Sequence, residues 1–356
     1  MVRSFVHEIH TVDNWTVERR EVPTDVLRAV SELSTEISLA LSDLADIRRL
    51  VDLIDTRVTE LPAGTRTLLR PPQTSAGAAV LGTLPVDDVE LGQTPPDWQT
   101  AARPDCSRPA SLCLDIALLL LARSIGIPFA WANQQNGQLV NNVVPTIGHE
   151  NEQLGSGSLT LLSPHTEDAF HPRRANLLLL GCLRNPDGVG TTISSVRHIR
   201  LTAGQRRELL TPNVPILPDI SYGTGHLGNP GPAVPTLWQP SEPEGLTLRY
   251  EPTCTPLDSA GAEFRAAYRE LGAELERVCN TVILSPGEIL LLDNDVAAHG
   301  RVPFRPRYDG GDRWLKRINI RLPHRRRNPA EADESGYGQQ IVAPFRGIED
   351  CPSIGG

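Results

Sequence analysis

The sequence is poor in lysine, in closely paired cysteines and in long apolar runs, and each shortage excludes a class of protein. Only Lys316 is a lysine among 34 basic residues, and 43 acidic residues bring the net charge to −9. This balance argues against a nucleic-acid partner, because phosphate backbones are bound through a surplus of clustered basic side chains. The longest apolar run, Ile116 to Ala122, is too short to span a bilayer, so we expect no membrane partner.

The cysteines also lack the spacing of a metal site or a disulfide framework. None of the six forms a Cys-x-x-Cys pair, and Cys182 lies inside an apolar run. Buried free thiols are typical of a reducing compartment. The first twenty residues are polar and mixed in charge, unlike a secretion signal, so we expect a cytoplasmic protein. The sequence does not indicate an oligomeric state.

The distribution of apolar residues predicts one domain, residues 1–356, built on strands. Short strands outnumber helices, which favours a β-sandwich or barrel core with helical cover. The expected parts are a helical cover over about 23–126, a β core over about 127–322 with insertions at 215–230 and 257–280, and a tail at 323–356.

Periodicity also predicts individual elements. They are one long helix or two over 23–61, a strand at 78–84, a buried helix over 109–126, a strand from 129 with a hairpin partner at 138–144, a strand at 177–183, an alternating strand at 191–200, a helix over 202–210 and strands at 246–253, 281–284, 287–294 and 314–320. The basic run at 324–327 is expected to be a solvated chain end.

His165, Glu167 and the distant His299 have the pattern of a metal site. Residues i and i+2 of a strand face the same side, so His165 and Glu167 can point to one ion while Thr166 points away. Two histidines and one carboxylate are the ligand set of mononuclear non-haem Fe(II) oxygenases, and they leave three coordination positions open for a 2-oxo acid and O2. His-x-Glu alone is a weak signal, because it also arises by chance.

A second signal follows His299. Arg313 stands at the start of the alternating strand 314–320, and Arg317 lies four residues further on, on the same side of that strand. A guanidinium can hold the far carboxylate of 2-oxoglutarate through two hydrogen bonds, which a lysine cannot. Arg313 is therefore the predicted co-substrate ligand.

Three motifs together resemble one known family. His-Thr-Glu-Asp-Ala-Phe at 165–170, Asn-Pro-Asp-Gly-Val-Gly-Thr-Thr at 185–192 and Arg-Trp-Leu-Lys-Arg-Ile-Asn-Ile at 313–320 are similar to the clavaminate synthase-like oxygenases. Among these, the chain most resembles the hydroxylases of free arginine, lysine, citrulline and asparagine. The resemblance extends from about Leu91 to Leu322.

The resemblance implies a mainly β fold, the double-stranded β-helix or jelly roll, with flanking α-helices. It implies Fe(II) held by the triad, 2-oxoglutarate and O2 as co-substrates, and hydroxylation of a free L-amino acid at C3 or, alternatively, C4. The residues that it carries over are Thr191 beside Arg313 for 2-oxoglutarate, Arg317 for the substrate carboxylate, and Gln135, Ser156, Asp219, Ser221, Glu251 and Thr253 for other substrate contacts. Residues 215–230 match the family's lid.

One departure from the family bears on the substrate. The arginine hydroxylases hold the guanidinium with two aspartates where this chain has Glu251 and Thr253. A single carboxylate suits a cationic ammonium group but not the paired hydrogen bonds of a guanidinium, so lysine is expected ahead of arginine or citrulline. The alternatives are a metal-binding cupin-like protein without oxygenase activity and a zinc hydrolase.

Overall fold

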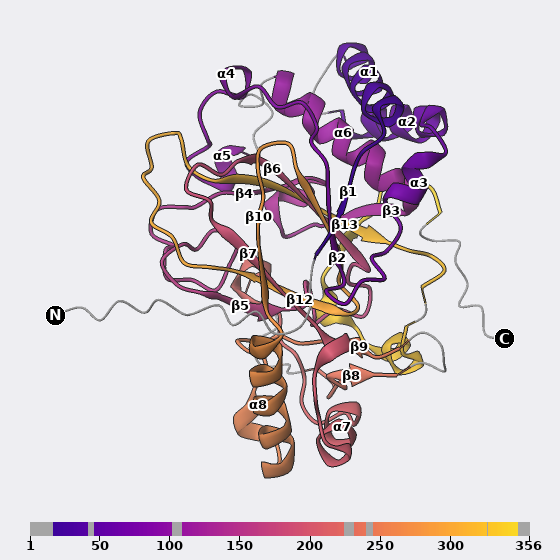
Figure 1. Ribbon diagram of the computed structural model, residues 1–356. Helices are drawn as coiled ribbons and strands as arrows, with labels where there is room; N and C mark the ends of the chain where they lie inside the picture. Colours follow the sequence, from indigo (N-terminus) through magenta and orange to yellow (C-terminus); the bar gives the residue numbers. More distant parts are fainter. Residues whose placement is uncertain are drawn as a thin grey trace.

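A computed structural model describes residues 17–41, 46–101, 109–223, 231–239, 245–325 and 327–347 (Figure 1). Its helices are α1 (Thr24–Ala40), α2 (Ile47–Arg57), α3 (Gly64–Leu68), α4 (Asp88–Leu91), α5 (Trp98–Ala101), α6 (Pro109–Ile125), α7 (Ala203–Leu210) and α8 (Ala262–Arg277). The helical periodicity at 23–61 thus belongs to two helices.

The larger of two main sheets runs in the order β1-β2-β11-β6-β13-β3-β14, with β4 also paired to β13. Its strands are β1 (Glu18–Arg20), β2 (Ala78–Leu81), β3 (Ile127–Trp131), β4 (Asn141–Val143), β6 (Leu177–Arg184), β11 (Ile289–Asp293), β13 (Trp314–Arg321) and β14 (Ile341–Val342). Among the described strands of this sheet, β1 and β2 pair in parallel and the other neighbours pair antiparallel.

The smaller sheet runs in the order β10-β7-β12-β5, and β8 pairs with β9 separately. The strands are β5 (Leu162–His165), β7 (Gly190–Ser195), β8 (Leu237–Trp238), β9 (Thr247–Leu248), β10 (Asn280–Ile283) and β12 (Ala297–Arg301). The strands predicted at 191–200 and 246–253 are shorter than expected. A turn of 3-10 helix replaces the end of the first at Val196–His198, and irregular backbone follows β9.

The continuous apolar run of β6 is explained by burial on both faces. Leu178 and Leu180 point into the core between the two sheets, where they join Ile193 of β7. Leu177 and Leu179 point the other way, into the core under α1, α2 and α6. A strand buried on both faces needs apolar residues at every position, which accounts for the absence of polar alternation.

The helices cover opposite ends of this sandwich (Figure 1). α1, α2, α3 and α6 lie over the large sheet, and α6 is apolar nearly all round because it packs between the other helices and the strands. α7 and α8 pack against each other and against β8 and β9 at the other end. The predicted β-sandwich with helical cover is confirmed in this form.

The predicted hairpin of β3 and β4 is wrong. Both strands pair with β13, β3 with residues 319–321 and β4 with residues 315–317, so they lie one after the other along the same neighbour. Local turn residues between two strands suggested a direct pairing. The turn at Gln135–Gly137 instead lies in the connection between β3 and β4, which pair with successive parts of β13.

Two arginines of the basic run at 324–327, Arg325 and Arg327, are not solvated as predicted, whereas His324 is exposed. Arg325 forms ion pairs with Asp293 and Asp295, and Arg327 forms one with Asp295 at 2.7 Å. Both aspartates are at most 2% exposed, so the arginines compensate buried charge. The prediction failed because these carboxylates lie at the end of β11 and in the turn that follows it, about thirty residues earlier in the chain.

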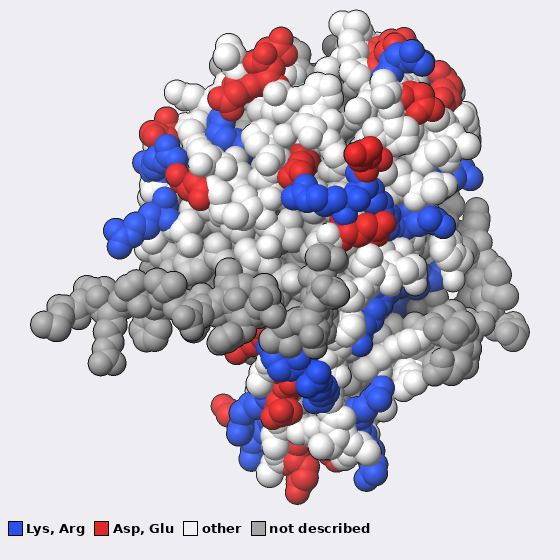
Figure 2. Space-filling model, in the orientation of Figure 1, with Lys and Arg blue, Asp and Glu red and all other residues white. Residues whose placement is uncertain are grey.

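Lys316 is also buried, at 2% exposure, where Nζ lies 2.9 Å from Asp115 of α6. On the face shown in Figure 2, arginines and acidic residues gather in small mixed groups. No described helix is long and apolar enough to cross a membrane. Four of the cysteines are described, Cys113, Cys182, Cys254 and Cys279, and all are free thiols.

Candidate active site

Two adjacent strands of the smaller sheet bring the predicted triad together. His165 ends β5 and lies directly opposite His299 of β12 in the antiparallel register. The carboxylate Oε2 of Glu167 is 3.4 Å from His299 Nε2 and 3.8 Å from His165 Nε2. One ligand atom from each residue lies within 4.8 Å of the others, so a single ion can be held by all three.

The surroundings fix the orientation of these ligands. His165 Nδ1 lies 2.9 Å from the carbonyl of Ser163, which leaves Nε2 for a metal. Asn294 accepts a hydrogen bond from the Glu167 amide and donates one to its carbonyl. Burial raises the pKa of Glu167, but Arg317 and the two histidines outweigh it and hold the pKa well below its usual value. The donor set therefore fits a divalent metal ion.

Asp168 anchors the turn that follows Glu167. Its backbone has φ +54, and its carboxylate accepts hydrogen bonds from Trp131 Nε1, at 2.6 Å, and from the hydroxyl of Tyr222. Burial, and then the charge of Glu167, raise the pKa of Asp168 to about 7. Tyr222 belongs to the region predicted as a lid, of which residues 224–230 lie outside the described residues.

Arg313 forms a buried cationic site without an acidic partner among the described residues. Its Nη2 donates to Thr191 Oγ1 at 3.4 Å, and its Nε has no partner there. Burial, and then the nearby Arg301, lower the pKa of Arg313 to about 10, so it remains charged at neutral pH. Burying a charge without a counter-ion costs free energy, so a bound anion would stabilise this site. The structure thus brings together the two residues predicted for 2-oxoglutarate.

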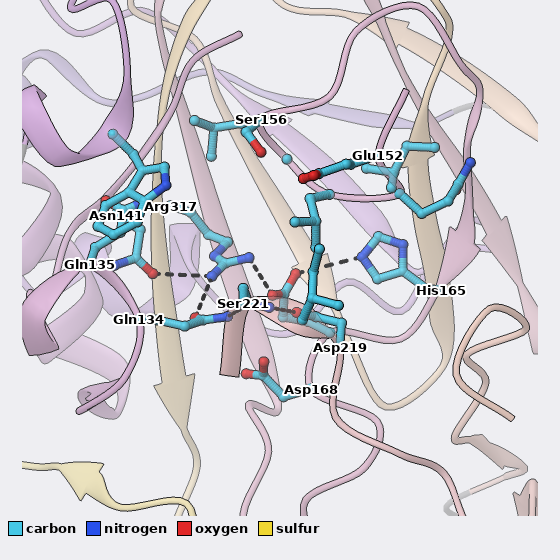
Figure 3. A pocket seen from close by; sticks show the side chains of 18 of the residues that line it. Gln134, Gln135, Asn141, Glu152, Ser156, His165, Asp168, Asp219, Ser221 and Arg317 are labelled. Carbon is cyan, nitrogen blue, oxygen red and sulfur yellow. Dashed lines mark hydrogen bonds and ion pairs between the residues drawn. The ribbon is translucent and has the colours of Figure 1, made fainter. Parts of the chain in front are cut away.

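A cavity of about 330 Å³ opens beside the triad and includes His165 and Glu167 in its wall (Figure 3). The predicted substrate residues that line it are Gln135, Ser156, Asp219, Ser221, Glu251 and Arg317. Thr253 is not among the lining residues. It donates instead to the carboxylate of Glu251 from its amide, at 3.0 Å, and from its hydroxyl, at 2.5 Å.

Arg317 joins the metal site to the rest of the cavity. It forms an ion pair with Glu167, and its Nη2 donates to Gln134 at 3.0 Å and to Asn141 at 3.1 Å. Gln134 in turn donates to Ser221 at 3.2 Å. Gln134 and Asn141 were not among the site residues predicted from the sequence.

Gln135 lines the cavity, but its amide is occupied by the backbone. It donates to the carbonyl of Asn142 and accepts from the amide of Asn142, both at 2.8 Å. Gln135 itself adopts φ +44, inside the tight turn that precedes Gly137. The pair of neighbouring glutamines was the available signal, but the sequence did not distinguish the roles of its two members.

The far wall of the cavity is acidic. Glu152, Asp219 and Glu251 come from three separate segments and all face it. In Figure 3, Glu152 lies on the side of His165, across the cavity from Arg317. The carboxylate of Glu152 lies 2.7 Å from Nδ1 of His149. Burial raises the pKa of Asp219. Glu152 could not be selected from the sequence, because it lies in an irregular loop.

Comparison with known proteins identifies the family. A family model described as taurine catabolism dioxygenase TauD, TfdA family matches residues 118–319. The chain belongs to the TauD/TfdA family. This TauD/TfdA protein is therefore a 2-oxoglutarate-dependent dioxygenase, and the predicted Fe(II), 2-oxoglutarate and O2 are confirmed. The alternatives of a non-catalytic cupin-like protein and a zinc hydrolase are set aside.

Its relatives include amino acid hydroxylases. An enduracididine beta-hydroxylase of Streptomyces hygroscopicus is 37% identical over 73% of this chain and 82% of its own. An L-ornithine/L-arginine 3-hydroxylase of Catenulispora acidiphila is 34% identical over 68% of this chain and 75% of its own. The solved structure of the non-heme iron oxygenase OrfP with Fe, succinate and (3S)-hydroxy-L-Arg covers 85% of this chain and 94% of its own, with a TM-score of 0.75 and 32% identity.

Proposed function

We propose that this dioxygenase hydroxylates a free L-amino acid with a cationic side chain, at C3 in preference to C4. The observation that carries the proposal is the acidic cavity wall of Glu152, Asp219 and Glu251 beside the metal triad. Carboxylates on one side of a partly enclosed cavity favour a positively charged ligand. The relatives named above support an amino acid substrate.

A guanidinium is proposed ahead of an ammonium, which corrects the sequence-based preference for lysine. The relatives give no support to lysine over arginine. The preference for lysine assumed that Glu251 alone faces the head group, whereas Asp219 and Glu152 face the same cavity. A planar guanidinium has five donors and is suited to several carboxylates that approach from different directions.

The proposed binding mode assigns one end of the amino acid to Arg317 and the other to the acidic wall. Arg317 pairs with Glu167, and its Nε has no partner among the described residues. Its guanidinium lines the cavity beside the triad, where it would bind the substrate α-carboxylate. Gln135 and Ser156 then border the substrate, while Ser221 holds Gln134 in place.

The iron would be held by His165, Glu167 and His299 and would supply the oxidising chemistry that splits 2-oxoglutarate to succinate and CO2. Arg313 and Thr191 would hold the distal carboxylate of the co-substrate. The polypeptide contributes orientation and charge. Arg313 orients 2-oxoglutarate, and the acidic wall of the cavity orients the side chain of the amino acid. We further propose that the two-sheet core is a double-stranded β-helix and that 1–356 is a single oxygenase domain.

The test is a panel of the twenty amino acids plus citrulline, ornithine and a cyclic arginine analogue, scored by succinate release and product mass. We expect succinate formation coupled to a mass gain of one oxygen with arginine or its cyclic analogue. Proton NMR of the product then distinguishes C3 from C4. Coupled turnover with neutral or acidic amino acids, but with no cationic one, would contradict the proposal.

A further inference from the structure

An arginine that none of the proposed roles uses links the strand of His299 to the loop that carries Glu152. Arg301 lies on β12 two residues after His299, so both side chains face the same side of the smaller sheet. In the register of β12 with β7, Arg301 is directly opposite Thr191, the partner of Arg313. It is 3% exposed and forms no ion pair with any described carboxylate.

The guanidinium of Arg301 donates its hydrogen bonds to a loop that lines the cavity. We call residues 146–160 the cavity loop, because Glu152 and Ser156 lie on it. Arg301 donates through Nη1 to the carbonyl of Gly157 and through Nη2 to the carbonyl of Thr160, the latter at 3.1 Å. A guanidinium offers two parallel donors to two neighbouring carbonyls, which fixes their separation.

The segment that follows Arg301 makes further contacts with the same loop. The amide of Phe304 donates to the carbonyl of Ser158 at 2.8 Å, and its ring lies under the guanidinium of Arg301 at 5.1 Å. The hydroxyl of Tyr308 donates to Glu150 at 3.0 Å. The connection between His299 and Arg313, the two residues that define the metal and co-substrate sites, is therefore attached to the cavity loop along its length.

We propose that Arg301 is a positioning residue that fastens the cavity loop to the strand carrying His299, so that the amino-acid site depends on the metal and co-substrate site. The other hydrogen bonds of the loop are local, within residues 146–163: the amides of Ser158 and Leu159 both donate to the carbonyl of Glu150, and the side chain of Gln153 bonds the backbone of residues 161 and 163. Without Arg301, the buried carbonyl of Gly157 and the partly buried carbonyl of Thr160 lose their charged donors, and such a loss destabilises this conformation of the loop.

Charge gives the coupling a direction. Arg301 and Arg313 are neighbouring buried cations, and repulsion from Arg301 acts on Arg313. A dicarboxylate bound to Arg313 reduces this repulsion and thereby stabilises the position of Arg301 that holds the loop. Because coupling between two sites is reciprocal, an ordered cavity loop then strengthens binding of the co-substrate by the same factor.

The proposal is tested on the iron-loaded protein without oxygen, by hydrogen–deuterium exchange of the peptide that covers residues 146–160. In the wild type, 2-oxoglutarate should slow exchange in this peptide. In Arg301→Met we expect exchange about tenfold faster or more, with no response to 2-oxoglutarate. Arg301→Lys keeps the charge but loses the paired donors, so it should give an intermediate rate. Arg307→Met is the matched control, because that arginine of the same segment forms an exposed ion pair with Asp187.

Steady-state kinetics provide a second readout, which alone rests on the proposed function. Arg301→Met should raise the KM of the amino acid about tenfold and that of 2-oxoglutarate by less than about threefold, a coupling weaker than is usual between two sites. A larger effect on 2-oxoglutarate, with unchanged loop exchange, would overturn the proposal and make Arg301 a direct ligand of the diacid. Exchange does not need the amino acid, so failure of the proposed function would leave the exchange result interpretable.

Discussion

The two ends of the active site are built from opposite charges. At one end Arg313, with Thr191 and Arg301 nearby, is buried without a carboxylate partner among the described residues. At the other end Asp219 and Glu251 face a cavity whose one arginine among the lining residues, Arg317, is already paired with Glu167. This difference would separate the anionic co-substrate from the proposed cationic substrate by charge before shape is involved.

The largest expected effect comes from the metal triad, on which both ends depend. His299→Ala removes one of three ligands, so we expect iron affinity to fall by more than about 100-fold, beyond the loss typical of residues that only support a ligand. Iron content after dialysis and succinate release measure the effect. His324→Ala, an exposed histidine, is the control and should behave as the wild type.

Exchanging the two arginines for methionine should separate the two ends. Arg313→Met should weaken 2-oxoglutarate binding by about 2–4 kcal/mol, because a buried carboxylate loses its charged partner. Arg317→Met should instead raise the KM of the amino acid and leave 2-oxoglutarate binding nearly intact. Titration of the iron-loaded protein without oxygen measures the first quantity. Weak 2-oxoglutarate binding in Arg317→Met would refute the division between the two sites.

Neutralising the acidic wall should change substrate preference without changing the co-substrate end. Glu251→Gln keeps the size of the side chain but removes its charge, so we expect the KM for arginine to rise about tenfold, as for loss of one charge-assisted hydrogen bond. The KM for neutral citrulline should rise much less. Thr253→Val, which loses the hydroxyl that donates to Glu251, should give a smaller effect in the same direction.

The smallest expected effect is a difference in pH dependence between the two ends. Burial raises the pKa of Asp219, so as the pH falls this carboxylate is protonated at a higher pH than an exposed aspartate. Protonation removes its charge and weakens binding of the cationic substrate. Arg313, whose pKa burial lowers to about 10, stays protonated at neutral pH. Between about pH 6 and about pH 8, affinity for 2-oxoglutarate should therefore stay flat. Asp219→Asn should remove the pH dependence of substrate binding that arises at this residue.

The sequence predicted the metal site better than the substrate site, and strand geometry explains why. The i, i+2 rule places His165 and Glu167 on one side of a strand end, and a ligand type as restricted as histidine makes His299 recognisable at a distance. Many of the side chains that line the cavity come from irregular loops, where no periodicity indicates which side chain faces a cavity. Glu152 was missed for this reason, and Gln134 was passed over for its neighbour.

The fold shows the same division between local and non-local information. The apolar periodicity of α1 and the apolar runs of α6 and β6 indicated their positions, because burial determines the pattern within one element. The partner of β4 depends on β13, far along the chain, and local turn residues carry no information about that choice. The ion pairs of Arg325 depend likewise on distant aspartates.

The single lysine has a practical consequence for chemical labelling. Nζ of Lys316 is the one side-chain amine in the chain, and it is enclosed between Asp115 of α6 and the ring of Trp314. An acylating reagent that reacts with amines can reach it only when β13 separates from α6. The rate at which residue 316 acquires an acyl group therefore reports the opening of the strand that bears Arg317, with no competing lysine to obscure the signal.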